Sequence, residues 1–151
     1  MTDFFLQQLQ QEAAEVRQFA RDDYNYKYES IGGPVATEYR DKLADFIATL
    51  TPVIPNGDLP IYFYYEEQGH SQPLHVDRDG FSLNVLCMLR QEYQGNKCSR
   101  LVLFPNGGEP KPFVIEPGYI LCFYAGSIIH CREPIQQGEI VNLITTGFMP
   151  I

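Results

Sequence analysis

The sequence has no apolar run that approaches the roughly 20 residues needed to span a bilayer. Its amino-terminal segment does not resemble a secretory signal, because Asp3 and Glu12 stand where a basic region is expected and glutamines interrupt the apolar residues. These two absences argue against a membrane-spanning protein and a secreted precursor. We therefore expect a cytoplasmic protein.

Positive charge is scarce, since 11 Lys and Arg stand against 19 Asp and Glu and the formal net charge is −8. Nucleic acids and anionic membranes are bound through concentrated Lys and Arg. Neither is therefore expected as a partner. The charge balance remains compatible with a local basic pocket for one anionic small molecule.

Paired cysteines, internal repeats and linker segments are also absent. The four cysteines (Cys87, Cys98, Cys122 and Cys131) show no CxxC spacing, which argues against a zinc cluster or a disulfide framework. A chain of 151 residues without a linker is most simply one domain spanning residues 1–151, large enough for a single core.

The chain divides into a mainly helical part, residues 1–55, and a strand-rich body, residues 59–148. Residues 2–22 and 35–50 repeat their apolar side chains at the helical period, and the stretch from Tyr24 to Pro34 between them is interpreted as a loop. Short β-rich segments separated by Gly and Pro turns follow at 61–65, 81–89, 100–104, 113–115, 119–124 and 140–148. We predict an α+β, mainly β fold: a double-stranded β-helix (a cupin-like jelly roll) with the helices packed outside one sheet.

Histidine is rare, with three residues in the chain, and two of them belong to one pattern. His75 and Asp77 are one residue apart, so on a strand both project from the same face while Val76 points away. Together with His130 they provide two imidazoles and one carboxylate. Such a facial triad leaves the opposite face of an octahedral ion open and suits non-haem Fe(II). For an isolated His-x-Asp pattern, surface or core histidines are the usual alternative.

The residues around this triad resemble the prolyl-hydroxylase branch of the 2-oxoglutarate- and Fe(II)-dependent oxygenases. The resemblance covers about residues 59–148 and depends on the order and spacing of its pieces. These are His75-Val76-Asp77, the runs at 81–86, 100–107, 115–118 and 121–123, and His130 followed by Pro134 and Gly138.

This resemblance implies that His75, Asp77 and His130 bind Fe(II), that 2-oxoglutarate chelates the iron through its 2-oxo acid end, and that O2 takes the last position. Oxidative decarboxylation of the cosubstrate to succinate and CO2 would accompany oxidation of an unactivated C–H bond. We expect an enzyme, a non-haem iron dioxygenase that hydroxylates a small molecule, an amino acid or a peptide side chain. The protein would hold the metal, orient the target carbon and exclude water.

One position departs from the pattern of the family. Its members usually bind the far carboxylate of 2-oxoglutarate with an Arg or Lys nine or ten residues after the distal histidine, where this chain has Glu139 and Ile140. Glu139 would repel a dicarboxylate, and Ile140 offers no hydrogen bond. Losing a guanidinium partner from a partly buried site costs about 2–5 kcal/mol, so another residue must replace it.

Three arginines are candidates for this replacement. Arg90 ranks first, because it lies fifteen residues after His75 on a strand whose alternation turns it inward with Asn84, Leu86 and Met88. Arg132, two residues after His130 and on the same face, ranks second, and Arg100, at the start of another strand, ranks third.

Tyr65 lies ten residues before His75, where the family often has a tyrosine that hydrogen-bonds the cosubstrate; an interior aromatic is the alternative. His70 is expected to face solvent, with substrate contact as the alternative. Asn142 and Thr145 on the last strand are further candidates for the pocket lining, although exposure is the more common fate of such residues.

Two other functions remain open. A metal-binding or sensing β-domain that has lost 2-oxoglutarate chemistry is supported by Glu139 and Ile140. A cupin-like metalloenzyme that uses O2 without an oxo acid is less favoured, because cupin sites usually draw on more histidines and only His70 is left. An oxygenase should bind 2-oxoglutarate only when the metal is present and should lose this binding with Asp77→Ala.

Overall fold

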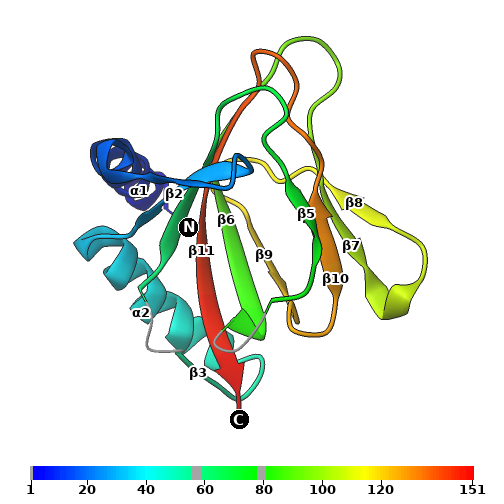
Figure 1. Ribbon diagram of the computed structural model, residues 1–151. Helices are drawn as coiled ribbons and strands as arrows, with labels where there is room; N and C mark the ends of the chain where they lie inside the picture. Colours follow the sequence, from blue (N-terminus) through cyan, green and yellow to red (C-terminus); the bar gives the residue numbers. More distant parts are fainter. Residues whose placement is uncertain (1, 56–58, 78–80) are drawn as a thin grey trace.

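The computed structural model describes residues 2–55, 59–77 and 81–151 (Figure 1). Its helices are α1 (Asp3–Val16) and α2 (Pro34–Ala48), with short 3-10 turns η1 (Arg17–Phe19) and η3 (Pro105–Gly107). The strands are β1 (Arg21–Asp23), β2 (Lys27–Ile31), β3 (Val53–Pro55), β4 (Ile61–Tyr65), β5 (Gln72–His75), β6 (Leu83–Glu92), β7 (Leu101–Phe104), β8 (Lys111–Phe113), β9 (Ile120–Phe123), β10 (Ile129–Arg132) and β11 (Ile140–Pro150). In the described part of the chain, no helix is long and apolar enough to cross a membrane.

The strands form two antiparallel sheets. The larger sheet has the order β1-β2-β4-β11-β6-β9, with β3 also paired to β11, and the smaller sheet has the order β5-β10-β7-β8. Figure 1 shows the helices on the outer face of the larger sheet and the smaller sheet on its other side. The predicted fold, a double-stranded β-helix with helices outside one sheet, is confirmed.

The larger sheet separates two hydrophobic clusters. The outer cluster joins the helices to the sheet, with Leu9 of α1, Ile47 of α2 and Tyr62 of β4 almost completely buried. The inner cluster lies between the two sheets and includes Met88, Leu103 and Leu143. Strand alternation divides each central strand of the larger sheet between the two clusters, which is why β6 is apolar on both faces.

A buried carboxylate fixes the two helices to each other. Glu12 of α1 accepts hydrogen bonds from the backbone N–H groups of Gly33, Val35 and Ala36 at distances of 3.1, 2.8 and 2.9 Å. It also accepts one from the Tyr62 hydroxyl at 2.8 Å. The first N–H groups of a helix have no intrahelical partner, and a negative charge is favourable there. Glu12 therefore caps the start of α2 from a neighbouring helix.

The first third of the chain differs from expectation at one place. The stretch interpreted as a loop contains β2, which pairs with both β1 and β4 and so extends the larger sheet. Tyr24 and Asn25 connect β1 to β2 with φ values of 50° and 61°. With Tyr26 they form a three-residue connection, and two successive residues at positive φ have a twist that suits a β-hairpin, so the aromatic run does not prevent strand pairing.

Candidate metal centre and cosubstrate pocket

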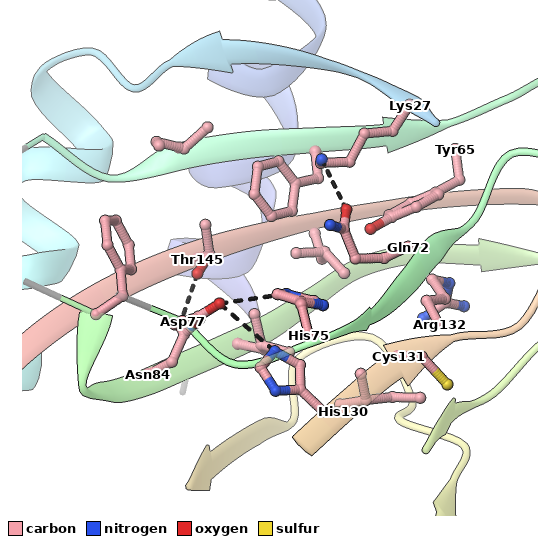
Figure 2. A pocket seen from close by; sticks show the side chains of 16 residues that line it. Lys27, Tyr65, Gln72, His75, Asp77, Asn84, His130, Cys131, Arg132 and Thr145 are labelled. Carbon is pink, nitrogen blue, oxygen red and sulfur yellow. Dashed lines mark hydrogen bonds and ion pairs between the residues drawn. The ribbon is translucent and has the colours of Figure 1, made fainter. Parts of the chain in front are cut away.

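The three side chains of the predicted triad meet between β5 and β10. His75 and His130 stand directly opposite each other in the β5–β10 ladder, and Asp77 follows β5. The Nε2 atoms of His75 and His130 lie 3.3 and 3.6 Å from Asp77 Oδ1, and the three potential ligand atoms are all within 4.8 Å of one another. Figure 2 shows them converging on one point of the pocket wall.

Both imidazoles are oriented by the backbone just before them. His75 Nδ1 is 2.7 Å from the carbonyl oxygen of Pro73, and His130 Nδ1 is 2.9 Å from that of Ile128. A carbonyl can only accept, so in the neutral imidazole Nδ1 carries the proton and Nε2 keeps its lone pair. Metal-binding histidines typically have such a partner on the distal ring nitrogen.

The Asp77 carboxylate is oriented from the larger sheet. Asn84 Nδ2 donates to Asp77 Oδ2 at 2.7 Å, and the Thr145 hydroxyl donates to Asn84 Oδ1 at 2.6 Å. These two hydrogen bonds leave Oδ1 of Asp77 directed at the imidazoles. Burial opposes ionisation, but the contacts with His130, His75 and Asn84 outweigh it and hold the pKa of Asp77 well below its usual value. The aspartate is therefore an anion at neutral pH.

These donors fit a divalent metal ion of the Fe(II) type. Two imidazole nitrogens and one carboxylate oxygen point at one place. Imidazole and carboxylate together suit borderline metals, and a three-residue face leaves positions for other ligands. The donor set and its outer hydrogen bonds thus have the chemistry that a mononuclear iron site requires.

A cavity of about 260 Å³ extends from the triad between the two sheets. Its lining is mostly apolar and includes Leu86, Leu101 and Leu143. Of the cosubstrate candidates from the sequence, Arg132 and Tyr65 line this cavity. Figure 2 shows Arg132 and Tyr65 on the side of the pocket away from Asp77 and Asn84. The pocket thus has a metal-binding end and a basic end.

Arg132 is a buried cation with a free donor. It is 4% exposed, and its Nη2 donates to the Ser99 hydroxyl at 3.0 Å. Its Nε has no hydrogen-bond partner among the described residues. Burial lowers the pKa of Arg132, and a buried charge without a direct counter-ion is costly. An anionic ligand at this end of the pocket would relieve that cost.

Glu139 does not face the pocket. It is 1% exposed, and its Oε1 accepts from the backbone N–H and the hydroxyl of Ser99 at 2.8 and 2.7 Å, while Oε2 accepts from Gln136 N at 2.9 Å. The same Ser99 hydroxyl accepts from Arg132. The expected repulsion of a dicarboxylate by Glu139 is therefore replaced by an indirect contact that holds Arg132 in position.

Arg90, the first-ranked anchor, does not line the pocket, so its predicted inward placement was wrong. On β6, Met88 stands opposite Leu143 but Arg90 stands opposite Asn142, so Leu89 is an extra residue in the ladder. Such a bulge reverses the alternation beyond it. Arg90 consequently leaves the inner face and pairs with Glu92 at 2.7 and 2.8 Å near the surface.

The other candidates from the sequence also differ in whether they lie at the surface or are buried. Arg100 is bound to Glu133 at 2.8 and 2.6 Å on the surface and lies outside the pocket lining. Tyr65 is buried, and burial raises the pKa of its hydroxyl. His70 is buried as well, contrary to expectation, and its Nδ1 accepts from Glu66 N at 3.3 Å.

Several pocket residues were not identified from the sequence, and two of them are polar side chains that meet in the pocket. Lys27 of β2 and Gln72 of β5 both line the cavity. The signal for Lys27 was present in the alternating run from Tyr24 to Tyr28, since a strand would turn Lys27 away from the face of these tyrosines. On the last strand, Thr145 lines the cavity and Asn142 does not.

The sequence matches no protein-family model and no curated protein. Solved structures do match, including a prolyl hydroxylase from Trichoplax adhaerens in complex with a hypoxia inducible factor peptide fragment (TM-score 0.79, 18% identity, 99% of this chain and 80% of that chain). A viral collagen prolyl hydroxylase from Paramecium Bursaria Chlorella virus-1, as a 2-oxoglutarate complex, gives 0.75 with 13% identity over 100% of this chain and 92% of that chain. The alpha-ketoglutarate-dependent epimerase SnoN from nogalamycin biosynthesis gives 0.78 with 10% identity, covering 99% and 74%.

At these identities the likeness establishes the fold. It is the double-stranded β-helix of the 2-oxoglutarate- and Fe(II)-dependent oxygenases, with prolyl hydroxylases among the matching structures. The resemblance found in the sequence is therefore confirmed at the level of the fold.

Proposed function

We propose that this protein is an Fe(II)- and 2-oxoglutarate-dependent dioxygenase that hydroxylates a C–H bond of a small molecule, an amino acid or a peptide side chain. The observation that carries the proposal is one cavity with two chemically different ends. Two imidazoles and a carboxylate converge at one end, and a buried guanidinium with a free donor lines the other. A ligand with a chelating oxo acid and a distant carboxylate matches both ends.

His75, Asp77 and His130 would hold the metal. Fe(II) bound there supplies the O2 activation that couples decarboxylation of 2-oxoglutarate to oxidation of the substrate. Arg132 would bind the far carboxylate of the cosubstrate, with the Tyr65 hydroxyl beside it. His130 and Arg132 are two residues apart on one face of β10, which separates their Cα atoms by about 6.8 Å. This spacing suits a five-carbon dicarboxylate lying along the strand.

The rest of the pocket would keep the reacting atoms in register and exclude water. The hydrogen bonds from Thr145 to Asn84 and from Asn84 to Asp77 would direct one oxygen of Asp77 at the metal position. The hydrogen bonds that link Glu139 to Ser99 and Ser99 to Arg132 hold the guanidinium of Arg132. Apolar side chains line the space between these two hydrogen-bonded groups, and their exclusion of water would strengthen the electrostatic contacts at both ends.

Titration of 2-oxoglutarate into the anaerobic Fe(II)-loaded protein tests this function. A saturable visible charge-transfer band is expected from the chelate, and no band is expected with Asp77→Ala. Iron that binds without any band on addition of 2-oxoglutarate would refute the oxygenase and favour a metal-binding domain. That alternative was supported by Glu139 and Ile140, and it loses the part that depends on repulsion by Glu139, because this carboxylate binds Ser99 outside the pocket lining.

A further inference from the structure

The β1–β2 hairpin brings a side chain into the pocket from outside the jelly roll. Its turn is closed by a hydrogen bond of 2.8 Å from Tyr26 N to the carbonyl of Asp23. The hairpin is fastened to the segment that leads into β5, because Ser71 N donates to the carbonyl of Tyr26 at 2.9 Å. The next residue along β2, Lys27, enters the pocket wall.

Lys27 is held there by contacts on three sides. Its ammonium donates to Gln72 Oε1 at 2.8 Å, forms an ion pair with Asp23, and lies 4.6 Å from the centroid of the Phe63 ring. Its side chain is 4% exposed, whereas that of Asp23 is 26% exposed. A lysine that served only to pair with Asp23 could do so in solvent, without the desolvation cost of a buried ammonium.

Most of the polar groups in the pocket already have a role in the proposed function. The triad is directed at the metal position, Asn84 and Thr145 hold Asp77, and Arg132 and Tyr65 suit the far end of the cosubstrate. Among the lining residues that the structure describes, the polar groups left over are Lys27, Gln72 and the Cys131 thiol. Figure 2 shows Lys27 and Gln72 together on one side of the pocket, facing its interior.

We propose that Lys27 and Gln72 form a subsite for a carboxylate of the substrate, separate from the one that Arg132 provides for 2-oxoglutarate. This inference depends on the proposed function and names its substrate class, a small organic acid with an apolar body. An ammonium has three N–H donors. Asp23 and Gln72 take two of them, which leaves one for the substrate, while the ring of Phe63 offers an apolar contact.

Anaerobic calorimetry on the Fe(II)-loaded protein saturated with 2-oxoglutarate tests the subsite with two probes. Butanoate and butanamide have similar shape and differ in charge. We expect saturable binding of butanoate and at least tenfold weaker binding of butanamide. Lys27→Met should reduce butanoate affinity at least tenfold and leave 2-oxoglutarate affinity within about threefold of wild type. Gln72→Met keeps the Lys27–Asp23 pair and serves as the second variant if Lys27→Met does not fold.

Lys42→Met is the matched control, because Lys42 also lies over a phenylalanine ring, 4.7 Å from the centroid of Phe5, and pairs with Glu38 away from this pocket. It should change neither affinity. Equal binding of the two probes, no saturable binding of butanoate, or unchanged affinity in Lys27→Met would each overturn the subsite. Loss of 2-oxoglutarate binding in Lys27→Met would overturn it too and assign Lys27 to the cosubstrate. Failure of the wild type to bind 2-oxoglutarate, measured first, would refute the proposed function itself.

Discussion

The two ends of the pocket are built in different ways. At the metal end, each imidazole is oriented by a carbonyl two residues before it, and His75 and Asp77 are neighbours on one segment. At the basic end, Arg132 is held by Ser99, which is held in turn by Glu139, and these residues come from three separate segments. Local contacts orient the two imidazoles, whereas long-range contacts position Arg132.

This difference explains why one end follows a family pattern in the sequence and the other departs from it. The metal end needs two strands in register and residues at fixed spacing. The basic end needs only a cation within reach of a carboxylate, and several strands can supply it. Glu139, at the usual position of that cation, binds Ser99 and Gln136 and lies outside the pocket lining.

The largest effect is expected from Asp77→Ala, which removes the one anionic group from the metal end. Loss of a residue that merely supports a ligand costs about 10- to 100-fold in metal affinity, so loss of the ligand itself should cost roughly 100-fold or more. Competition with a chelator of known affinity would measure this. Val76→Ala, at an exposed neighbour that points away, should bind metal normally. Metal affinity within a few-fold of wild type in Asp77→Ala would disprove the triad.

Arg132→Met tests the basic end. We expect an affinity for 2-oxoglutarate lower by about 2 kcal/mol or more, roughly 30-fold, because a charge-assisted contact in a buried site is lost. Affinity for 2-oxopentanoate, which lacks the far carboxylate, should not change. Arg90→Met and Arg100→Met are controls that should retain 2-oxoglutarate binding. Loss of 2-oxoglutarate binding in Arg90→Met instead would contradict the outward placement of Arg90.

Glu139→Gln tests how the basic end is held. Glu139 Oε1 accepts two hydrogen bonds in a buried setting, and an amide in its place offers one oxygen and adds donors. The free energy of unfolding should fall by about 1–3 kcal/mol, as measured by urea denaturation. Glu133→Gln, at a partly exposed ion pair with Arg100, should cost less than about 1 kcal/mol. Equal effects of the two substitutions would contradict the role given to Glu139.

Asn84→Ala tests the outer contacts of the metal end. Without the amide, Asp77 Oδ2 loses its donor and the carboxylate can rotate. We expect a metal affinity about tenfold lower, measured by the same chelator competition. An unchanged metal affinity in a folded Asn84→Ala protein would mean that Asp77 is oriented by the imidazoles alone.

The smallest effect is expected from a pair of neighbouring threonines. Thr145→Val removes the donor to Asn84 and should lower stability by about 1 kcal/mol. The Thr146 hydroxyl is buried and has no hydrogen-bond partner among the described residues, so Thr146→Val should be neutral or stabilising. Chemical denaturation of both variants would compare them directly. A larger loss of stability in Thr146→Val than in Thr145→Val would contradict the placement of these two threonines on opposite faces of β11.

Strands β2 and β6 show why the sequence predicted some features of the fold and missed others. The helices and the strands β4 and β7 follow from periodicity and from the turns that flank them. Pairing of β2 was missed because Tyr24 and Asn25 were interpreted as part of a loop, and the turn has no glycine, although asparagine tolerates the positive φ that it requires. The bulge at Leu89 leaves no trace in the periodicity, because β6 is apolar on both faces up to that point.

The sequence by itself determined the class of fold and brought the candidate metal ligands onto one face, because spacing along a strand dictates direction. Tertiary structure alone decided which cation reaches the pocket. A single extra residue turned Arg90 outward, Ser99 and Glu139 held Arg132 inward, and a hairpin carried Lys27 to Gln72. These outcomes depend on contacts between segments far apart in the chain, which local periodicity does not encode.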